Sequence, residues 1–175
     1  MASTLVLADD TGAATGSPAK GTTRVNPTTN WNWLNSTTVT TAPASAFIVI
    51  GTNSYERFRF GVITGTFTEL SNGLWAHTAG TFGSNITLMG VVTSTYTTPA
   101  VTTNAALTED MTAAIAVGSG QTVLFSTTGP EGAAPAATLT AAGYTQYLAT
   151  QMLTASGAAT GATATATLSL QYDES

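Results

Sequence analysis

The 175-residue sequence has few ionisable side chains: four Lys or Arg, nine Asp or Glu, one His and no Cys. Acid–base catalysis, covalent catalysis and metal binding all need such residues placed close together. Long stretches nearly lack them, and Glu131 is the only acidic residue between Met111 and Tyr172. We therefore expect no catalytic residue, no metal ligand and no cofactor, and a protein that is not an enzyme.

The scarcity of basic residues also bears on partners. With four cations and a net charge of −5, the chain is a poor candidate for nucleic acid binding, which needs several Lys or Arg. It has no run of 18 apolar residues, so we expect no membrane-spanning segment. Its first ten residues lack the basic region of a signal peptide, which predicts synthesis in a cytoplasm. Without Cys there are no disulfides, so the fold must depend on its core.

Threonine is abundant instead, with 38 residues, and hydrophobic residues make up 43% of the chain whereas charged residues make up 7%. Surfaces of hydroxyl and amide groups cost less to desolvate than charged surfaces. This composition is typical of a protein that assembles with other subunits. The length allows one domain with its own core. We expect that domain over residues 31–175, preceded by an N-terminal arm over residues 1–30.

The predicted arm is rich in small and turn-forming residues. It contains Lys20 and Arg24, two of the four cations, which could contact an acidic neighbouring subunit. An unstructured linker is the alternative interpretation. Trp31 and Trp33 follow, and their spacing places both indoles on one face of an extended segment, which we assign to the core.

Alternating and β-branched segments predict an all-β fold, an antiparallel β-sandwich of the jelly-roll or immunoglobulin-like kind. Asn72-Gly73 predicts a type I′ hairpin between two of its strands. One short helix is expected at 108–117, with Thr108 as its cap and Met111 on its buried face. The expected strands lie at 46–50, 55–62, 66–70, 74–78, 85–98, 122–126, 144–153 and 162–172.

Two acidic residues near the N-terminus suggest possible chemistry. Asp10-Thr11-Gly12-Ala13 resembles the aspartic protease signature, whose two carboxylates share one proton. Only one copy is present, so a second chain would have to supply the other Asp; a solvent-exposed turn is the alternative. Asp9 and Asp10 could also contact Ca²⁺, although further oxygen ligands at loop spacing are missing.

The remaining candidates are one histidine and one charged strand. His77 has no second His or Cys to complete a zinc site, so we interpret it as a hydrogen-bonded structural residue on the same face as Trp75. Arg57 and Arg59 alternate with apolar residues, which predicts an exposed strand face. They could pair with Glu69 or contact an acidic partner subunit. The predicted subunit-contact residues are Lys20, Arg24, Arg57 and Arg59.

Segments Asn72–Gly83, Gly118–Thr128 and Leu168–Glu174 resemble small virion structural proteins of tailed bacteriophages, above all capsid cement (decoration) proteins. The resemblance implies a β-rich protein of the virion that stabilises the phage head without catalysis. Its partners would be the major capsid protein or other virion subunits. It would bind as a homo-oligomer, most simply a trimer. The alternative is a tail-fibre or adhesin-like module that stacks a host surface carbohydrate on Trp31, Trp33, Trp75 or the tyrosines.

Overall fold

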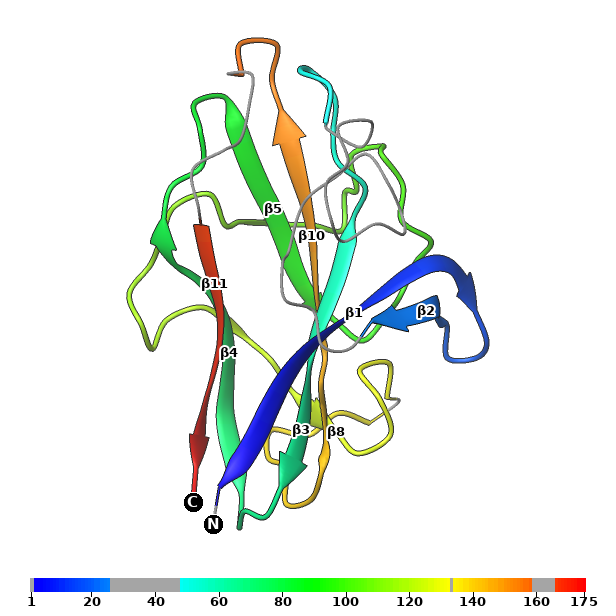
Figure 1. Cartoon of the computed structure of the whole chain (residues 1–175), viewed down its shortest axis with the longest axis vertical. Helices are drawn as coiled ribbons and strands as arrows, with labels where there is room; N and C mark the ends of the chain where they lie inside the picture. Colours follow the sequence, from blue (N-terminus) through cyan, green and yellow to red (C-terminus); the bar gives the residue numbers. More distant parts are fainter. Residues whose placement is uncertain (1, 26–47, 133, 159–165) are drawn as a thin grey trace.

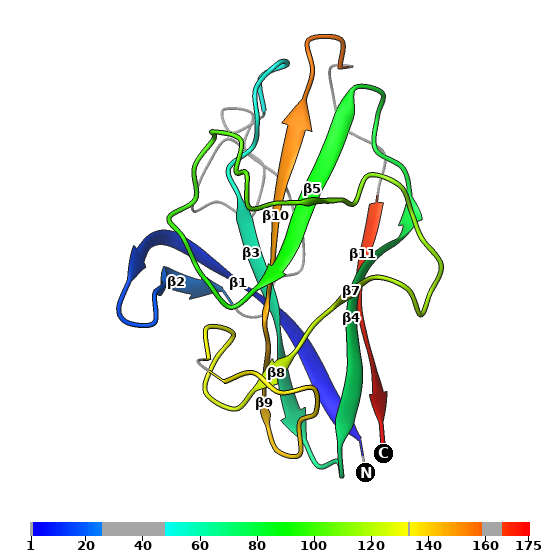
Figure 2. The same cartoon turned by 180° about the vertical axis from the view of Figure 1, so that it is seen from behind.

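The computed structural model describes residues 2–25, 48–132, 134–158 and 166–175. In these residues all regular secondary structure is β, arranged as two antiparallel sheets (Figures 1 and 2). The two sheets pack against each other through a shared core, as in a β-sandwich. The predicted all-β class is therefore confirmed. Trp31 and Trp33 lie outside the described residues.

The larger sheet contains eight strands, six of them in the order β2-β1-β3-β10-β5-β6. Strand β9 pairs with β3, and β8 pairs with β9. The bounds are β1 (Ser3–Thr15), β2 (Lys20–Val25), β3 (Arg57–Gly65), β5 (Ile86–Thr93), β6 (Glu109–Asp110), β8 (Phe125–Ser126), β9 (Gly143–Thr145) and β10 (Tyr147–Thr154).

The smaller sheet has three strands in the order β11-β4-β7. Its strands are β4 (Leu70–Gly80), β7 (Gln121–Thr122) and β11 (Ala166–Glu174). Trp75 from β4 is fully buried against Leu88 of β5 and Leu148 of β10. This indole therefore links the two sheets.

Residues 3–25 form two strands of the larger sheet, so the predicted N-terminal arm is not confirmed. From Ser3 to Asp10, β1 pairs residue by residue with β3, and from Asp9 to Thr15 it pairs with β2. The apolar run from Leu5 to Ala8 explains the difference, because a strand packed on both faces is apolar without alternation. Residues 26–30 lie outside the described part of the chain.

Asn72 and Gly73 lie inside a continuous strand β4, so the predicted hairpin is wrong. The register against β11 shifts there: Ser71 pairs with Asp173, and Leu74 pairs with Gln171. One extra residue is thus accommodated in β4 as a β-bulge. Asn72 has a φ of 53°, which Asn tolerates better than most residues. Asn72 does adopt the positive φ that an Asn-Gly pair favours, but it does so in a β-bulge and not in a hairpin turn.

The segment expected to be a helix, 108–117, is also extended or irregular. Glu109 and Asp110 form β6 and pair with β5, and the Met111 amide donates to the Leu88 carbonyl. The Met111 side chain enters the core beside Trp75. Burial of Met111 against a sheet edge thus outweighs the local helical pattern.

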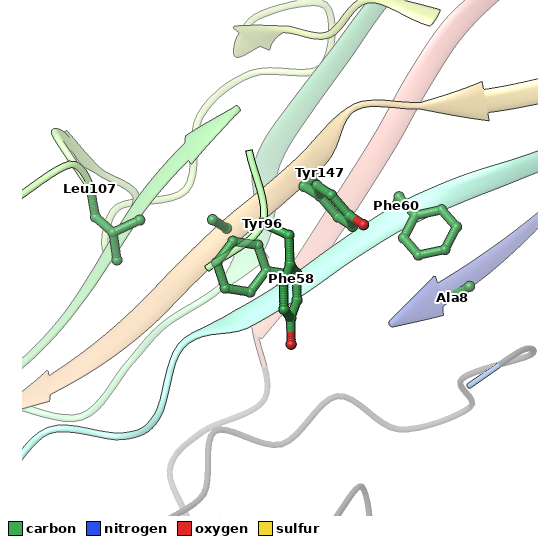
Figure 3. Packing of buried hydrophobic residues seen from close by; sticks show 7 residues of the cluster. Ala8, Phe58, Phe60, Tyr96, Leu107 and Tyr147 are labelled. Atoms are coloured by element: carbon green, nitrogen blue, oxygen red, sulfur yellow. The ribbon is translucent and has the colours of Figure 1, made fainter. Parts of the chain in front are cut away.

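Both faces of the larger sheet are covered. On the face opposite the smaller sheet, Phe58 and Phe60 of β3 pack with Tyr147 of β10 (Figure 3). Tyr96 and Leu107, from the segment between β5 and β6, cover these rings, and the Phe58 and Tyr96 ring centroids are 4.6 Å apart. Alternation then directs the neighbouring residues of β3 toward the smaller sheet. The sheet has no solvated face on which β3 could display charges.

Two buried polar side chains hold the segment between β5 and β6 in place. The Gln151 amide nitrogen donates to the carbonyl groups of Ser54 and Thr102, at 2.9 and 3.0 Å. The Glu56 carboxylate accepts the Ala100 backbone N–H and, at 3.1 Å, the Asn104 side-chain amide. These bonds provide partners for the buried side chains of Gln151 and Glu56, which would otherwise be buried without hydrogen bonds.

Candidate functional site

Asp10 and Arg24 form the centre of the most highly charged region of the described structure. They lie opposite each other in the register of β1 and β2. Arg24 donates from Nε and Nη2 to the two carboxylate oxygens of Asp10, both at 2.8 Å. The Asp10 side chain is buried, whereas 33% of the Arg24 side chain is exposed. Two parallel charge-assisted bonds of this kind are among the stronger polar contacts in proteins.

Glu131 and Tyr147 complete what we call the Asp10 cluster: Asp10, Arg24, Glu131 and Tyr147. The Tyr147 hydroxyl donates to Asp10 Oδ2 and lies 3.1 Å from Glu131 Oε2. Arg24 Nη2 lies 3.5 Å from the same Glu131 oxygen. The Arg24 guanidinium also stacks over Phe60, 4.6 Å from the ring centroid, a favourable cation–π arrangement. One guanidinium and one phenol thus connect two carboxylates.

The environment of the Asp10 cluster changes the proton affinity of its members. The hydrogen bonds to Asp10 raise the pKa of Arg24 above its usual range, although burial opposes this effect. Burial raises the pKa of Tyr147 well above 10.0, and the hydrogen bond to Asp10 raises it further. Both groups therefore stay protonated across the physiological pH range: Arg24 supplies one positive charge to the carboxylates, and Tyr147 contacts them as a neutral donor.

A cavity of about 460 Å³ adjoins the cluster, between the turn joining β1 to β2 and the loop after β8. Glu131 belongs both to the cluster and to the cavity lining, and 11% of its side chain is exposed. The lining groups are small or polar: Gly16, Ser17, Pro18, Lys20, Thr128, Glu131 and Gly132. Hydroxyl, ammonium and carboxylate groups of this kind can hydrogen-bond a polar molecule.

A second ion pair lies on the other face of β1. Arg59 donates from Nε and Nη2 to Asp9, at 2.8 and 3.1 Å, and both side chains are buried. Consecutive residues Asp9 and Asp10 point to opposite faces of the sheet, so each needs its own cation. Neither aspartate lies in the solvent-exposed turn that the sequence suggested, because both belong to strand β1.

The structure places the four predicted contact residues differently from one another. Lys20 is exposed at the start of β2, and Arg24 is only partly accessible. Arg57 and Arg59 are 3% and 6% exposed, so the predicted exposed strand face is wrong. Arg59 pairs with Asp9 and not with Glu69. Burial lowers the pKa of Arg57 from its usual value.

The protease and metal hypotheses gain no support from the geometry. The Asp10 carboxylate is buried and accepts hydrogen bonds from Arg24 and Tyr147, so it cannot contact a substrate or a catalytic water. Within the described residues, no three His, Asp or Glu side chains come together as a metal site. His77 is buried, with its ring nitrogens 3.0 Å from the Met111 carbonyl and 2.8 Å from the Ala79 carbonyl. The hydrogen-bonded structural role predicted for His77 is confirmed.

Sequence reasoning missed two members of the Asp10 cluster, Glu131 and Tyr147. Glu131 is separated from Asp10 by more than half of the chain, so no local spacing connects them. A usable signal did exist: Glu131 is an isolated acidic residue in a long apolar and hydroxylated stretch. Tyr147 carried no such signal, because aromatic residues are common in any strand.

Comparison with known protein families, with characterised proteins and with solved structures found no match for the chain. A search of the described residues for a helix long and apolar enough to cross a membrane also found none.

Proposed function

We propose that the chain is a non-enzymatic structural protein of a virion, a capsid cement (decoration) protein that stabilises a phage head through contacts with other subunits. One observation carries the proposal: several of the few charged side chains are buried inside the molecule instead of lying on its surface. Two of the four basic and three of the nine acidic side chains are buried: Arg57, Arg59, Asp9, Asp10 and Glu56.

Charges placed inside leave a surface made largely of hydroxyl, amide and small apolar groups. Such a surface loses little hydration energy when another subunit covers it. It suits permanent assembly better than steering of a charged ligand. The proposal includes a homo-oligomer, with a trimer as the simplest form, and a domain of the jelly-roll or immunoglobulin-like kind bound to the major capsid protein.

The test is the location of the protein in cells that produce it. An antibody against the chain is used to follow it through a density gradient of the cell lysate. We expect the chain to sediment with particles, and imaging of those particles to place it on the head surface. A chain that stays at the top of the gradient as a free protein, from cells that yield intact particles, contradicts the proposal.

Carbohydrate recognition is the second candidate, supported by the polar cavity beside Glu131. Trp75 cannot serve as a stacking platform, because it is fully buried. A glycan array with the purified chain tests this function, with Thr128→Val as the matched variant for the cavity. Binding of a glycan that is lost in Thr128→Val favours recognition, whereas no binding on the array removes this candidate.

A further inference from the structure

The outer edge of β11 is open in the described structure. β11 pairs with β4 on one side, and no described strand pairs with its other side. Its inward-facing residues Leu168, Leu170 and Tyr172 pack on the core but stay partly exposed. An unpaired edge presents backbone donors and acceptors to any extended chain beside it.

The N-terminal half of β1 lies on the same side of the molecule. Its residues Ser3 to Ala8 pair with β3 only, because β2 begins to pair at Asp9. The Ser3 amide donates to the Glu174 carboxylate at 3.0 Å, which joins the two sheets at the end where both termini lie (Figures 1 and 2). The contact between Ser3 and Glu174 thus closes the sandwich at the C-terminal end of β11, and the unpaired edge of the strand begins there.

A cavity of about 700 Å³, with both apolar and polar lining residues, lies beside this edge. Val117 is 79% exposed, the largest exposed fraction among the large hydrophobic side chains of the described chain. The apolar lining residues are Leu5, Leu74, Val117, Leu170 and Tyr172. An added strand would cover these side chains and place alternate residues of its own against them.

Gln171 connects β11 to the segment that contains Val117. Its side-chain oxygen accepts the Gly118 backbone N–H at 2.8 Å. Its amide nitrogen is buried and has no hydrogen-bond partner among the described residues. A buried donor without an acceptor costs free energy. Gln171 thus holds Gly118, and Val117 before it, beside the edge before any strand is added.

Charge sets the direction of the incoming strand. The acidic residues Glu69, Asp173 and Glu174 lie at one end of β11, and none of them forms an ion pair in the described structure. Asp173 accepts a hydrogen bond from the Asn72 side chain, and Glu174 accepts from Ser3. These neutral donors leave the carboxylates without a counter-charge, so this end favours a basic residue.

We propose that β11 accepts an extended segment of a neighbouring subunit as an added antiparallel strand. The segment alternates apolar residues and carries Lys or Arg at its N-terminal end, beside Asp173 and Glu174. The antiparallel direction follows the pairing of every described strand pair. The identity of the neighbour as a virion subunit rests on the proposed function, whereas the strand addition itself does not.

The test uses a synthetic peptide of about ten residues, the length of a common strand, with alternating Val and Thr and two Lys at its N-terminus. NMR spectra of the isotopically labelled chain are recorded during the titration. We expect the largest amide shifts, and slower hydrogen exchange, in Ala166–Glu174. The same peptide with its Lys at the C-terminus should bind about three- to tenfold more weakly, because exposed ion pairs are individually weak.

Two variants make the test specific. Val117→Asp changes an exposed residue, so the fold should persist, and it should weaken binding about tenfold or more, since it puts an unpaired charge in the interface. Val101→Asp is the control, because Val101 is 40% exposed and does not line the cavity. Asp173→Asn combined with Glu174→Gln should remove the preference for N-terminal Lys.

Amide shifts outside β11, no shifts at all, or equal binding by Val117→Asp would overturn the inference. The proposed function is judged separately by sedimentation with particles. A chain that binds the peptide at β11 but never sediments with particles refutes only the virion role. A Val117→Asp chain that occupies particles as fully as the wild type refutes only the role of β11 in that assembly.

Discussion

At the scale of single residues, Tyr147 illustrates how this chain keeps charges inside. Its hydroxyl touches carboxylate oxygens of both Asp10 and Glu131, two groups of like charge. Arg24 contacts the same two carboxylates. Since both faces of the larger sheet are covered, water cannot replace these donors at Asp10.

Replacing Tyr147 by Phe should therefore destabilise the fold. The ring and its packing remain, but the buried Asp10 carboxylate loses a donor. We expect the free energy of unfolding to fall by about 1–3 kcal/mol, the cost of an unsatisfied buried polar group. Urea denaturation measures the change. Tyr172→Phe is the control, because its hydroxyl contacts Ser3 in a partly exposed position; an equal loss in both variants contradicts this account.

The two buried tyrosines also predict the behaviour in alkali. Burial raises the pKa of Tyr96 and of Tyr147 above the ordinary 10.0. A raised pKa in the folded state means that their contribution to stability is complete below about pH 10 and declines as the pH rises further. We expect tyrosinate absorbance to show these two residues ionising only when the chain unfolds. Tyr147→Phe should make stability less dependent on pH above 10, and an unchanged dependence argues against it.

At the scale of strands, the bulge in β4 depends on one backbone conformation. Asn72 adopts a positive φ, which costs a β-branched residue more than Asn and costs Gly least. Asn72→Val should lower the free energy of unfolding by about 1–2 kcal/mol, as is typical for a strained backbone position. Asn72→Gly keeps the conformation and should lose about 0.5 kcal/mol or less, mainly the exposed bond to Asp173. Thermal or urea unfolding distinguishes the two; equal stabilities refute the bulge.

The strands were predictable where a segment shows either a clear alternation of apolar and polar residues or a run of β-branched residues. β3, β5 and β10 follow the alternation or the β-branched runs seen in the sequence, because packing on a sheet selects those patterns. The Asn-Gly signal was read as a turn, since turns and bulges require the same positive φ. The pattern of β1 was not readable, because Asp9 and Asp10 follow its apolar run and look like solvent-exposed residues.

The Asp10 cluster was not predictable for a related reason. A buried aspartate is stable only with its cation, and that cation comes from elsewhere in the chain. Arg24 is 14 residues from Asp10, Arg59 is 50 residues from Asp9 and Glu131 is 107 residues from Arg24. Such pairs cannot be inferred from the spacing of charged residues along the sequence. Only the sheet order brings them together.

At the scale of the whole molecule, the described chain forms three layers: the smaller sheet, the larger sheet and the loops that cover it. β1 has a structural role in the larger sheet, where it links β2 to β3. Its Leu5 and Leu7 pack in the shared core. An N-terminal arm would be dispensable for folding, and this strand is not.

Deleting residues 2–15 should therefore abolish the fold. The deletion exposes the edge of β3 and leaves Arg59 and Arg24 without the two aspartates, and losing a partner from a buried ion pair costs about 3–5 kcal/mol. That is a large part of the roughly 5–15 kcal/mol by which a typical domain is stable, and the packing of Leu5 and Leu7 is lost as well. We expect no cooperative heat transition by circular dichroism. A chain lacking only residues 1 and 2 is the control, and a deletion variant that melts cooperatively at the wild-type temperature contradicts this role of β1.

The strand order has a consequence for biosynthesis. β10 lies between β3 and β5, and β11 is the edge partner of β4, so both sheets wait for residues from the last third of the chain. In a nascent polypeptide that ends at residue 140, the aromatic core residues are exposed and the strands that pair with β10 and β11 lack these partners. Chains in this state are prone to aggregate. Folding on the ribosome is thus postponed until β10 and β11 have been synthesised, and chaperones would have to protect the earlier strands from aggregation until then.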